Sequence, residues 1–176
     1  LLICHIADRL VQQGHHVLCV THSVEHATHL HEFYAGSGLA CGDVDADKRR
    51  DAIANSPVSF ATVDVAAEAL NVPSLSAIIV MTPFGARSQG NLLQQALGRI
   101  QRRKENKKEP VASFISDSSI GMCRGLLRQV RKKLREWQYP QEDIYAGNGR
   151  GGVATTQELL RLPLVPNEEK GGVRDR

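Results

Sequence analysis

The chain has 176 residues, 41% of them hydrophobic and 23% charged, with a formal net charge of +3, which is typical of one soluble globular domain. No apolar run approaches the roughly 20 residues that a membrane-spanning helix needs. The sequence starts at Leu1 without an initiator Met or a basic stretch, so no signal peptide is predicted, and we expect the chain to begin inside a longer protein.

Short apolar runs alternate with helix-like segments along residues 1–140. In chain order, the sequence predicts a helix at Leu2–Gln13, a strand at Val17–Thr21, a helix at Val24–Tyr34, a strand at Leu39–Cys41, a helix at Ala46–Ala54, a strand at Val58–Thr62, a helix at Val65–Leu70, a strand at Ala77–Thr82, a helix at Leu92–Arg102, a strand at Val111–Ser116 and a helix at Ser119–Trp137. Most of the strand-like runs do not alternate with polar residues, which favours parallel strands covered on both faces. We therefore predict an α/β fold with a doubly wound, mainly parallel sheet flanked by helices.

The last predicted helix is amphipathic. Its apolar stripe consists of Met122, Leu126, Val130, Leu134 and Trp137. This stripe is expected to pack on the core. Asp117 and Ser118 are candidate N-caps, and Pro140 is expected to stop the helix. Residues 141–176 are rich in glycine and are predicted to form a flexible tail or linker.

Basic residues and cysteines are unevenly placed. Twelve of the 22 basic residues lie between Arg99 and Arg135, against three acids, which favours a polyanion as partner, a solvated charged face being the alternative. The four cysteines are Cys4, Cys19, Cys41 and Cys123. They form no C-x-x-C pair, so neither a disulfide framework nor a cysteine-rich zinc site is predicted. A soluble intracellular protein of the cytoplasm or nucleus is expected.

The most specific pattern is QALGRIQR at residues 95–102, which reads Q-x-x-G-R-x-x-R. On a helix, Arg99 and Arg102 project from one face, and Gln95 lies one turn earlier. Guanidinium groups form charge-assisted bidentate hydrogen bonds to phosphate. An arginine from outside a nucleotide pocket stabilises charge on the transferred phosphoryl group, an effect worth about 10³–10⁵ in rate. The alternative is a pair of surface arginines on a basic helix.

Three upstream strands end in polar turns. The strand Val58–Thr62 leads into the segment FATVDVAAEALNVP at residues 60–73 and delivers Thr62 and Asp64 at its carboxyl end. The strand from Ala77 ends in Thr82 and a proline, and the first strand opens onto His22 and Ser23. Ligands of open α/β sheets bind at this edge.

The order and spacing of these segments resembles motifs IV, V and VI of superfamily 2 helicases, and especially the DEAD-like helicases of large DNA viruses and phages. The resemblance covers about residues 1–140 and implies the C-terminal RecA-like domain of an ATP-dependent helicase. It implies an ATP-contacting role for Arg99 and Arg102, with Arg102 as the arginine finger and Gln95 coupling the nucleotide to the other domain.

The same resemblance implies roles for the other turns. Asn71 and Gly98 would lie near the nucleotide. The positions implied for nucleic-acid phosphates are Thr62, His22, Ser23 and Thr82. Two residues depart from the family pattern: Ala69 stands where the family usually has Gly, and Asn71 where it usually has Asp.

The sequence lacks a G-x-x-x-x-G-K-[ST] loop and a D-E-x-x box. We therefore expect ATP with Mg²⁺ to be bound mainly by a preceding N-terminal RecA-like domain of the same protein, and this chain alone to be inactive. The expected partners are that domain and DNA or RNA, and no membrane.

Two other functions remain open. One is a non-catalytic RecA-like module with decayed motifs that binds nucleic acid or protein. The other is a zinc hydrolase, because His22 to His26 match H-x-x-E-H. That pattern needs both histidines on one helix, whereas His22 is predicted at a strand exit.

Overall fold

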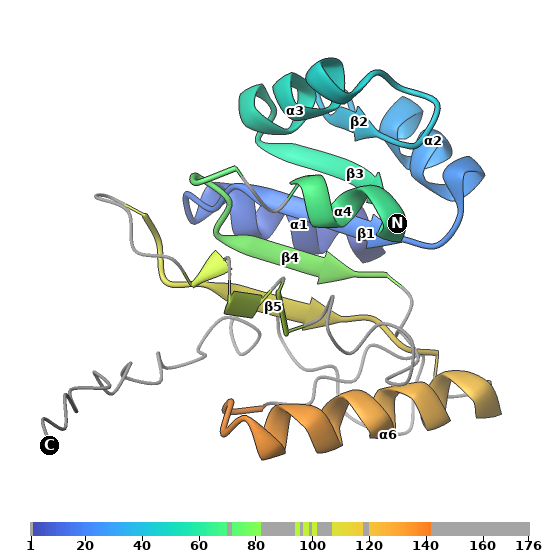
Figure 1. Cartoon of the computed structure of the whole chain (residues 1–176), viewed down its shortest axis with the longest axis vertical. Helices are drawn as coiled ribbons and strands as arrows, with labels where there is room; N and C mark the ends of the chain where they lie inside the picture. Colours follow the sequence, from blue (N-terminus) through green and yellow to red (C-terminus); the bar gives the residue numbers. More distant parts are fainter. Residues whose placement is uncertain are drawn as a thin grey trace, which may run out of the picture.

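The computed structural model describes residues 2–69, 72–81, 94–95, 97–98, 100–101, 107–117 and 120–141, with the backbone alone at residues 67–69. Its elements are α1 (Leu2–Gln12), β1 (Val17–Thr21), α2 (Val24–Phe33), β2 (Gly38–Ala40), α3 (Ala46–Asn55), β3 (Val58–Thr62), α4 (Val63–Ala69), β4 (Ala77–Val80), β5 (Val111–Phe114) and α6 (Gly121–Glu136), as Figure 1 shows. Gln94, Gln95, Leu97, Gly98 and Ile100 are also helical. The rest of the predicted helix Leu92–Arg102, apart from Gln101, and the predicted tail from residue 142 onward lie outside the described residues.

The strands form one five-stranded sheet in the order β2-β3-β1-β4-β5, and every neighbouring pair is parallel. β1 lies at the centre of this sheet, with β3 on one side and β4 on the other (Figure 1). A parallel sheet with helices on both faces is a doubly wound α/β fold, so the predicted fold class is confirmed.

Side chains of the strands alternate between two hydrophobic cores on opposite faces of the sheet. The first core is covered by α3, α4 and α6 and includes Leu18, Val20, Ile53, Val65, Ile78, Val80, Leu97, Ile100, Val130 and Leu134. The second core is covered by α1 and α2 and includes Leu10, Val17, Cys19, Leu30, Phe60 and Ile79. Each fully buried large side chain contributes roughly 1.5–3 kcal/mol through removal of apolar surface from water, so these cores supply most of the stability.

Three of the four cysteines lie in the second core. Cys4, Cys19 and Cys41 are buried free thiols, and Cys123 is a partly exposed free thiol on α6. Burial raises the pKa of the Cys4, Cys19 and Cys41 thiols. These three cysteines therefore act as small apolar packing groups and are poor nucleophiles.

Some predicted boundaries are corrected. β2 lies one residue earlier than predicted, because Gly38 pairs with Ser59 of β3. β4 and β5 each end two residues before the predicted strands do. α4 begins at Val63, with no connecting residue after Thr62, whereas the prediction began at Val65. Val63 favours a strand by residue type, but it is the first residue of α4, and its side chain packs in the first core.

The beginning of α6 also differs from the prediction. The N-cap is Ile120, and no side chain caps the helix. Asp117 was therefore the wrong N-cap, since its carbonyl accepts instead from the Ile120 N–H at 3.3 Å, and Ser118 lies outside the described residues. The predicted apolar stripe is buried only in its second half, where Val130 and Leu134 join the first core, whereas Met122 is 70% exposed.

The end of α6 is a Schellman motif rather than a stop at Pro140. The N–H of Gln138 bonds to the Arg135 carbonyl at 3.0 Å, and the N–H of Tyr139 bonds to the Leu134 carbonyl at 2.9 Å. Gln138 adopts the left-handed conformation with φ 60° that this motif requires. These two backbone hydrogen bonds therefore end the helix, and Pro140 follows directly after Tyr139.

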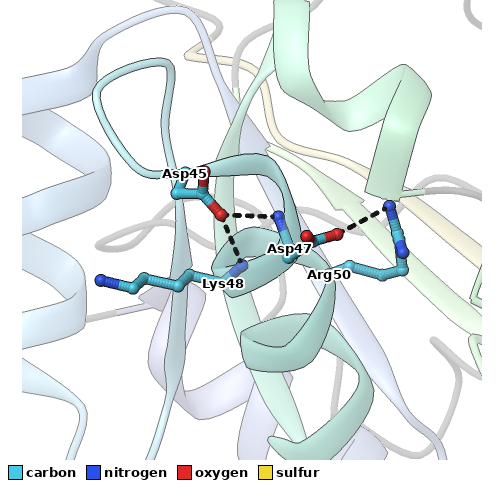
Figure 2. A network of polar contacts seen from close by, with 4 residues as sticks. All are labelled: Asp45, Asp47, Lys48 and Arg50. Carbon is cyan, nitrogen blue, oxygen red and sulfur yellow. Dashed lines mark hydrogen bonds and ion pairs between the residues drawn. The ribbon is translucent and has the colours of Figure 1, made fainter.

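The beginning of α3 is capped by Asp45, as Figure 2 shows. Its carboxylate accepts from the backbone N–H groups of Asp47 and Lys48 at 3.0 and 3.5 Å. Arg50 forms an exposed ion pair with Asp47 at 3.4 Å, a contact worth under about 1 kcal/mol. The cap therefore defines where α3 begins, and Ile53 packs the helix on the first core.

Within the described part of the chain, every helix is too short or too polar to serve as a membrane span.

Candidate nucleic-acid and nucleotide interface

The carboxyl ends of β1 and β3 meet at the centre of the sheet edge. Thr21 and Thr62 are register partners, so the predicted phosphate residue Thr62 lies beside the polar turn that follows β1. Both threonines are largely buried, at 1% and 5% exposed. Exposed polar groups at this edge therefore come from the residues that follow the strands: His22 and Ser23 after β1, and Asp64 after β3.

The turn after β1 is organised by hydrogen bonds. Ser23 is the N-cap of α2, and its hydroxyl accepts from the His26 N–H at 3.2 Å. Thr21 Oγ1 contacts His26 Nδ1 at 3.2 Å and accepts from the Ser23 N–H at 3.4 Å. His22 and Ser23 are exposed, at the positive end of the α2 dipole. Such an N-terminus favours anions such as phosphate.

The same geometry bears on the zinc-hydrolase alternative. His22 precedes α2, and His26 lies inside it, so the two histidines of H-x-x-E-H do not share a helix. In the described ranges, no three histidine, cysteine or carboxylate side chains gather where they would hold a metal ion. His26 instead directs Nδ1 at Thr21 and helps to shape the turn.

The helix that carries the Q-x-x-G-R-x-x-R pattern is anchored by two apolar residues. Leu97 and Ile100 are 4% and 2% exposed and belong to the first core. Gln95 and Gly98 are exposed. A Cβ added at Gly98 would have no described heavy atom within 4 Å. Packing within the described residues therefore gives no reason for a glycine at this position.

Four of the predicted site residues lie outside the described residues: Asn71, Thr82, Arg99 and Arg102. Their roles stay predictions. Thr82 follows Met81, whose N–H bonds to the Val20 carbonyl at 2.9 Å. The chain therefore leaves β4 at the same edge as Thr21 and Thr62. The structure brings Thr62, His22 and Ser23 to one edge, as predicted.

α6 lies on the β5 side of the sheet (Figure 1) and carries exposed basic side chains. The arginine and lysine side chains exposed on it are Arg124, Arg128, Lys132 and Arg135. Lys133 pairs with Glu136 at 2.8 Å, and its hydrogen bond lowers the pKa of that carboxyl group. Six of the twelve basic residues between Arg99 and Arg135 therefore lie on α6.

A second polar cluster, which the sequence analysis missed, lies at the opposite edge of the sheet. His16 Nδ1 contacts Ser74 Oγ at 2.7 Å, and His15 Nδ1 contacts Ser76 Oγ at 3.2 Å. Burial, together with the charge of Lys108, lowers the pKa of His15. The two histidines directly precede β1 and the two serines precede β4, so the contacts form only when the two strands pair, and no local sequence pattern predicts them. The cluster ties β1 to β4 on the side away from the candidate interface.

Comparison with known proteins adds little to this geometry. No protein-family model matches the chain, and no curated protein matches it. A solved structure described as the C-terminal part of the Fun30 ATPase domain is similar, with a TM-score of 0.47 and 13% identity over 62% of this chain. The match spans 37% of that chain. The fold class therefore rests on the sheet topology itself, and the likeness to viral and phage helicases stays a prediction.

Proposed function

We propose that this chain is the C-terminal motor domain of an ATP-dependent nucleic-acid helicase or translocase of superfamily 2. In this proposal it supplies the arginines that complete an ATP site and part of the surface that holds the nucleic-acid backbone. The observation that carries the proposal is the position of the Gln/Arg helix: Leu97 and Ile100 are buried in the first core while Gln95 and Gly98 face outward.

Helical periodicity extends this observation to the arginines. At about 100° per residue, Gln95, Arg99 and Arg102 fall within about 60° of one another, opposite the side of Leu97 and Ile100. Burial of the apolar side therefore favours an outward direction for all three polar residues. A side chain must face outward to contact a nucleotide that another domain holds, because a side chain buried in the core of this domain would not reach that nucleotide.

The nucleotide in this proposal is ATP with Mg²⁺. The exposed Gln95 amide and the two arginines fit the terminal phosphate of a nucleotide. Gly98 leaves room for close approach, and Asn71 would bind near the ribose. The phosphate-cradling loop and the Mg²⁺ carboxylate would come from a preceding domain of the same protein. ATP would supply the phosphoryl group that is transferred, and the arginines of this chain would stabilise the charge that develops on that group.

The proposal assigns the backbone of DNA or RNA to the edge formed by Thr62, His22, Ser23 and Thr82. Support comes from the exposed α2 N-terminus and from the basic face of α6. Because phosphate contacts release counterions, affinity should fall steeply as salt rises. Replacing Arg128 and Lys132 together with Gln should flatten the salt dependence, and unchanged slopes in a titration from low to physiological salt would remove α6 from the interface.

The central test compares two neighbouring arginines in the full-length protein. Arg102→Ala should lower ATP turnover by about 10³-fold or more, because it removes charge stabilisation met only in the transition state. Arg103→Ala is the matched control, since Arg103 is the neighbouring arginine and lies outside the Q-x-x-G-R-x-x-R pattern. We expect it to leave hydrolysis nearly unchanged. Equal turnover in the two variants would mean that the pattern is a basic surface.

A non-catalytic binding module is the second candidate, and two residues favour it. Ala69 and Asn71 stand where the superfamily usually has Gly and Asp, and Asn71 lacks the charge of an aspartate. In that case the full-length protein would bind nucleic acid without ATP turnover. Steady-state hydrolysis in the presence of single-stranded DNA and RNA separates the two candidates.

A further inference from the structure

We propose that Tyr139 is a positioning residue that fixes the end of the Gln/Arg helix at Gln101, the residue directly before Arg102. This inference rests on the proposed function. Tyr139 lies 38 positions along the chain from Gln101, the residue that its hydroxyl group contacts. No feature of the Q-x-x-G-R-x-x-R pattern points to Tyr139, because the contact exists only in the folded chain.

The first step is the hydrogen bond itself. Tyr139 Oη donates to Gln101 Oε1 at 3.0 Å, in a partly buried setting. A phenolic hydroxyl and an amide oxygen are a well-matched donor and acceptor, and 3.0 Å is close to the usual distance. Partial burial limits competition from water, so the bond is a stronger constraint than it would be on an open surface.

The second step is what holds Tyr139 in place. Its N–H bonds to the Leu134 carbonyl in the Schellman motif, and the left-handed Gln138 before it turns the chain back over α6. The ring lies edge-to-face with Trp137, with the centroids 6.5 Å apart and an interplanar angle of 89°. Both rings pack against the first core. The hydroxyl is therefore presented by a rigid turn.

The third step concerns Gln101, which directly precedes Arg102. Its N–H closes a helical bond to the Leu97 carbonyl at 3.2 Å. Leu97 and Ile100 fix one side of the helix in the core, and Gln101 follows Ile100 where the last backbone carbonyls of a helix lack intrahelical partners. Tyr139 provides a further contact there, one residue before the predicted finger.

A small displacement of a catalytic group is expensive in rate, since about 1 Å can cost on the order of 100-fold. Tyr139→Phe removes the hydroxyl and keeps the ring, so the packing and the Schellman turn remain. In the full-length protein we expect ATP turnover to fall about tenfold, with the KM for ATP changed less than about twofold, because the loss is confined to the transition state.

Two further comparisons separate positioning from general destabilisation. Gln101→Met should lower turnover by a similar factor, and the Tyr139→Phe/Gln101→Met double variant should be no worse than either single variant. In an Arg102→Ala background, Tyr139→Phe should have no further effect. Tyr34→Phe is the matched control: it also loses a hydroxyl that donates to a side chain, that of Asp8, but beneath the other face of the sheet.

The experiment measures ATP turnover for all of these variants, together with backbone amide hydrogen exchange at residues 97–101. The expected result is slower turnover and faster exchange there in Tyr139→Phe, with neither change in Tyr34→Phe. An active wild type with turnover unchanged in Tyr139→Phe, or reduced equally in the Arg102→Ala background, would overturn the positioning role alone. A wild type without ATP turnover would instead overturn the proposed function, and the positioning role with it.

Discussion

Replacing Gly98 with alanine is expected to raise the free energy of unfolding while lowering ATP hydrolysis. Gly98 is helical and exposed, and a Cβ there would have no described heavy atom within 4 Å. A glycine inside a helix costs about 0.5–1 kcal/mol relative to alanine, mainly because the unfolded chain has more freedom to lose. Since no clash with the described residues offsets that gain, Gly98→Ala should stabilise the domain by about 0.5–1 kcal/mol.

The effect on hydrolysis has the opposite sign. If a nucleotide held by the preceding domain approaches this helix closely, an added methyl group at position 98 occupies space that the nucleotide needs. We expect ATP turnover by the full-length protein to fall by about tenfold, equivalent to about 1.4 kcal/mol in the transition state. A variant that is both more stable and less active cannot be explained by damage to the fold.

Gly125 in the middle of α6 is a matched control. It is also helical, and an added Cβ there would likewise have no described heavy atom within 4 Å. Gly125→Ala should therefore stabilise the protein by a similar amount and leave hydrolysis unchanged. The assays are equilibrium unfolding in guanidinium chloride and steady-state ATP turnover. If both variants are equally stable and fully active, the face around Gly98 is ordinary surface and our account of it is wrong.

Three further predictions concern the fold. Gly38→Ala should destabilise the domain by about 3 kcal/mol, because the added Cβ would lie 2.4 Å from the Ala52 carbonyl oxygen. Gly42→Ala is the control: an added Cβ there has no described atom within 4 Å, so the free energy of unfolding in denaturant should hardly change. Gln138→Gly should stabilise the protein by about 1 kcal/mol, because glycine adopts the left-handed conformation of the Schellman motif without strain; a lower unfolding midpoint would contradict this. Burial lowers the pKa of His15 below its ordinary value, so the unfolded chain binds the extra proton first and stability should fall as the pH drops below about 6.5. His15→Gln should weaken that loss between pH 7.5 and 5.5, and an identical pH dependence in both proteins would refute the assignment.

The parts of the fold that local sequence determines were predicted well. β1 and β3 have the bounds that their apolar runs predict, because strands buried on both faces consist mainly of apolar residues. The predicted α4 began two residues late. Val63 continues the apolar run of β3 in the sequence, so the sequence alone does not show where the strand ends and the helix begins. The N-cap of α6 was misplaced because Asp117 is a favourable cap by type, whereas the helix begins later, at Gly121.

The candidate site was predicted less completely than the fold. Parallel strands place their carboxyl ends on one edge, so the meeting of Thr62 with the turn at Ser23 follows from the strand assignment. The contacts of Tyr139 with Gln101 and of His16 with Ser74 did not follow from it. They join residues 38 and 58 positions apart, and no local pattern encodes a pairing of that kind.

The direct junction of β3 and α4 makes the chain intolerant of a change in length at that point. Thr62 ends the strand and Val63 opens the helix, so no residue between them can absorb an insertion. One extra residue would turn the following helix by about 100° relative to the strand. That rotation would carry Val65 and Ala66 out of the first core and expose apolar surface in their place. A single inserted residue would therefore do more damage here than a much longer insertion in a surface loop.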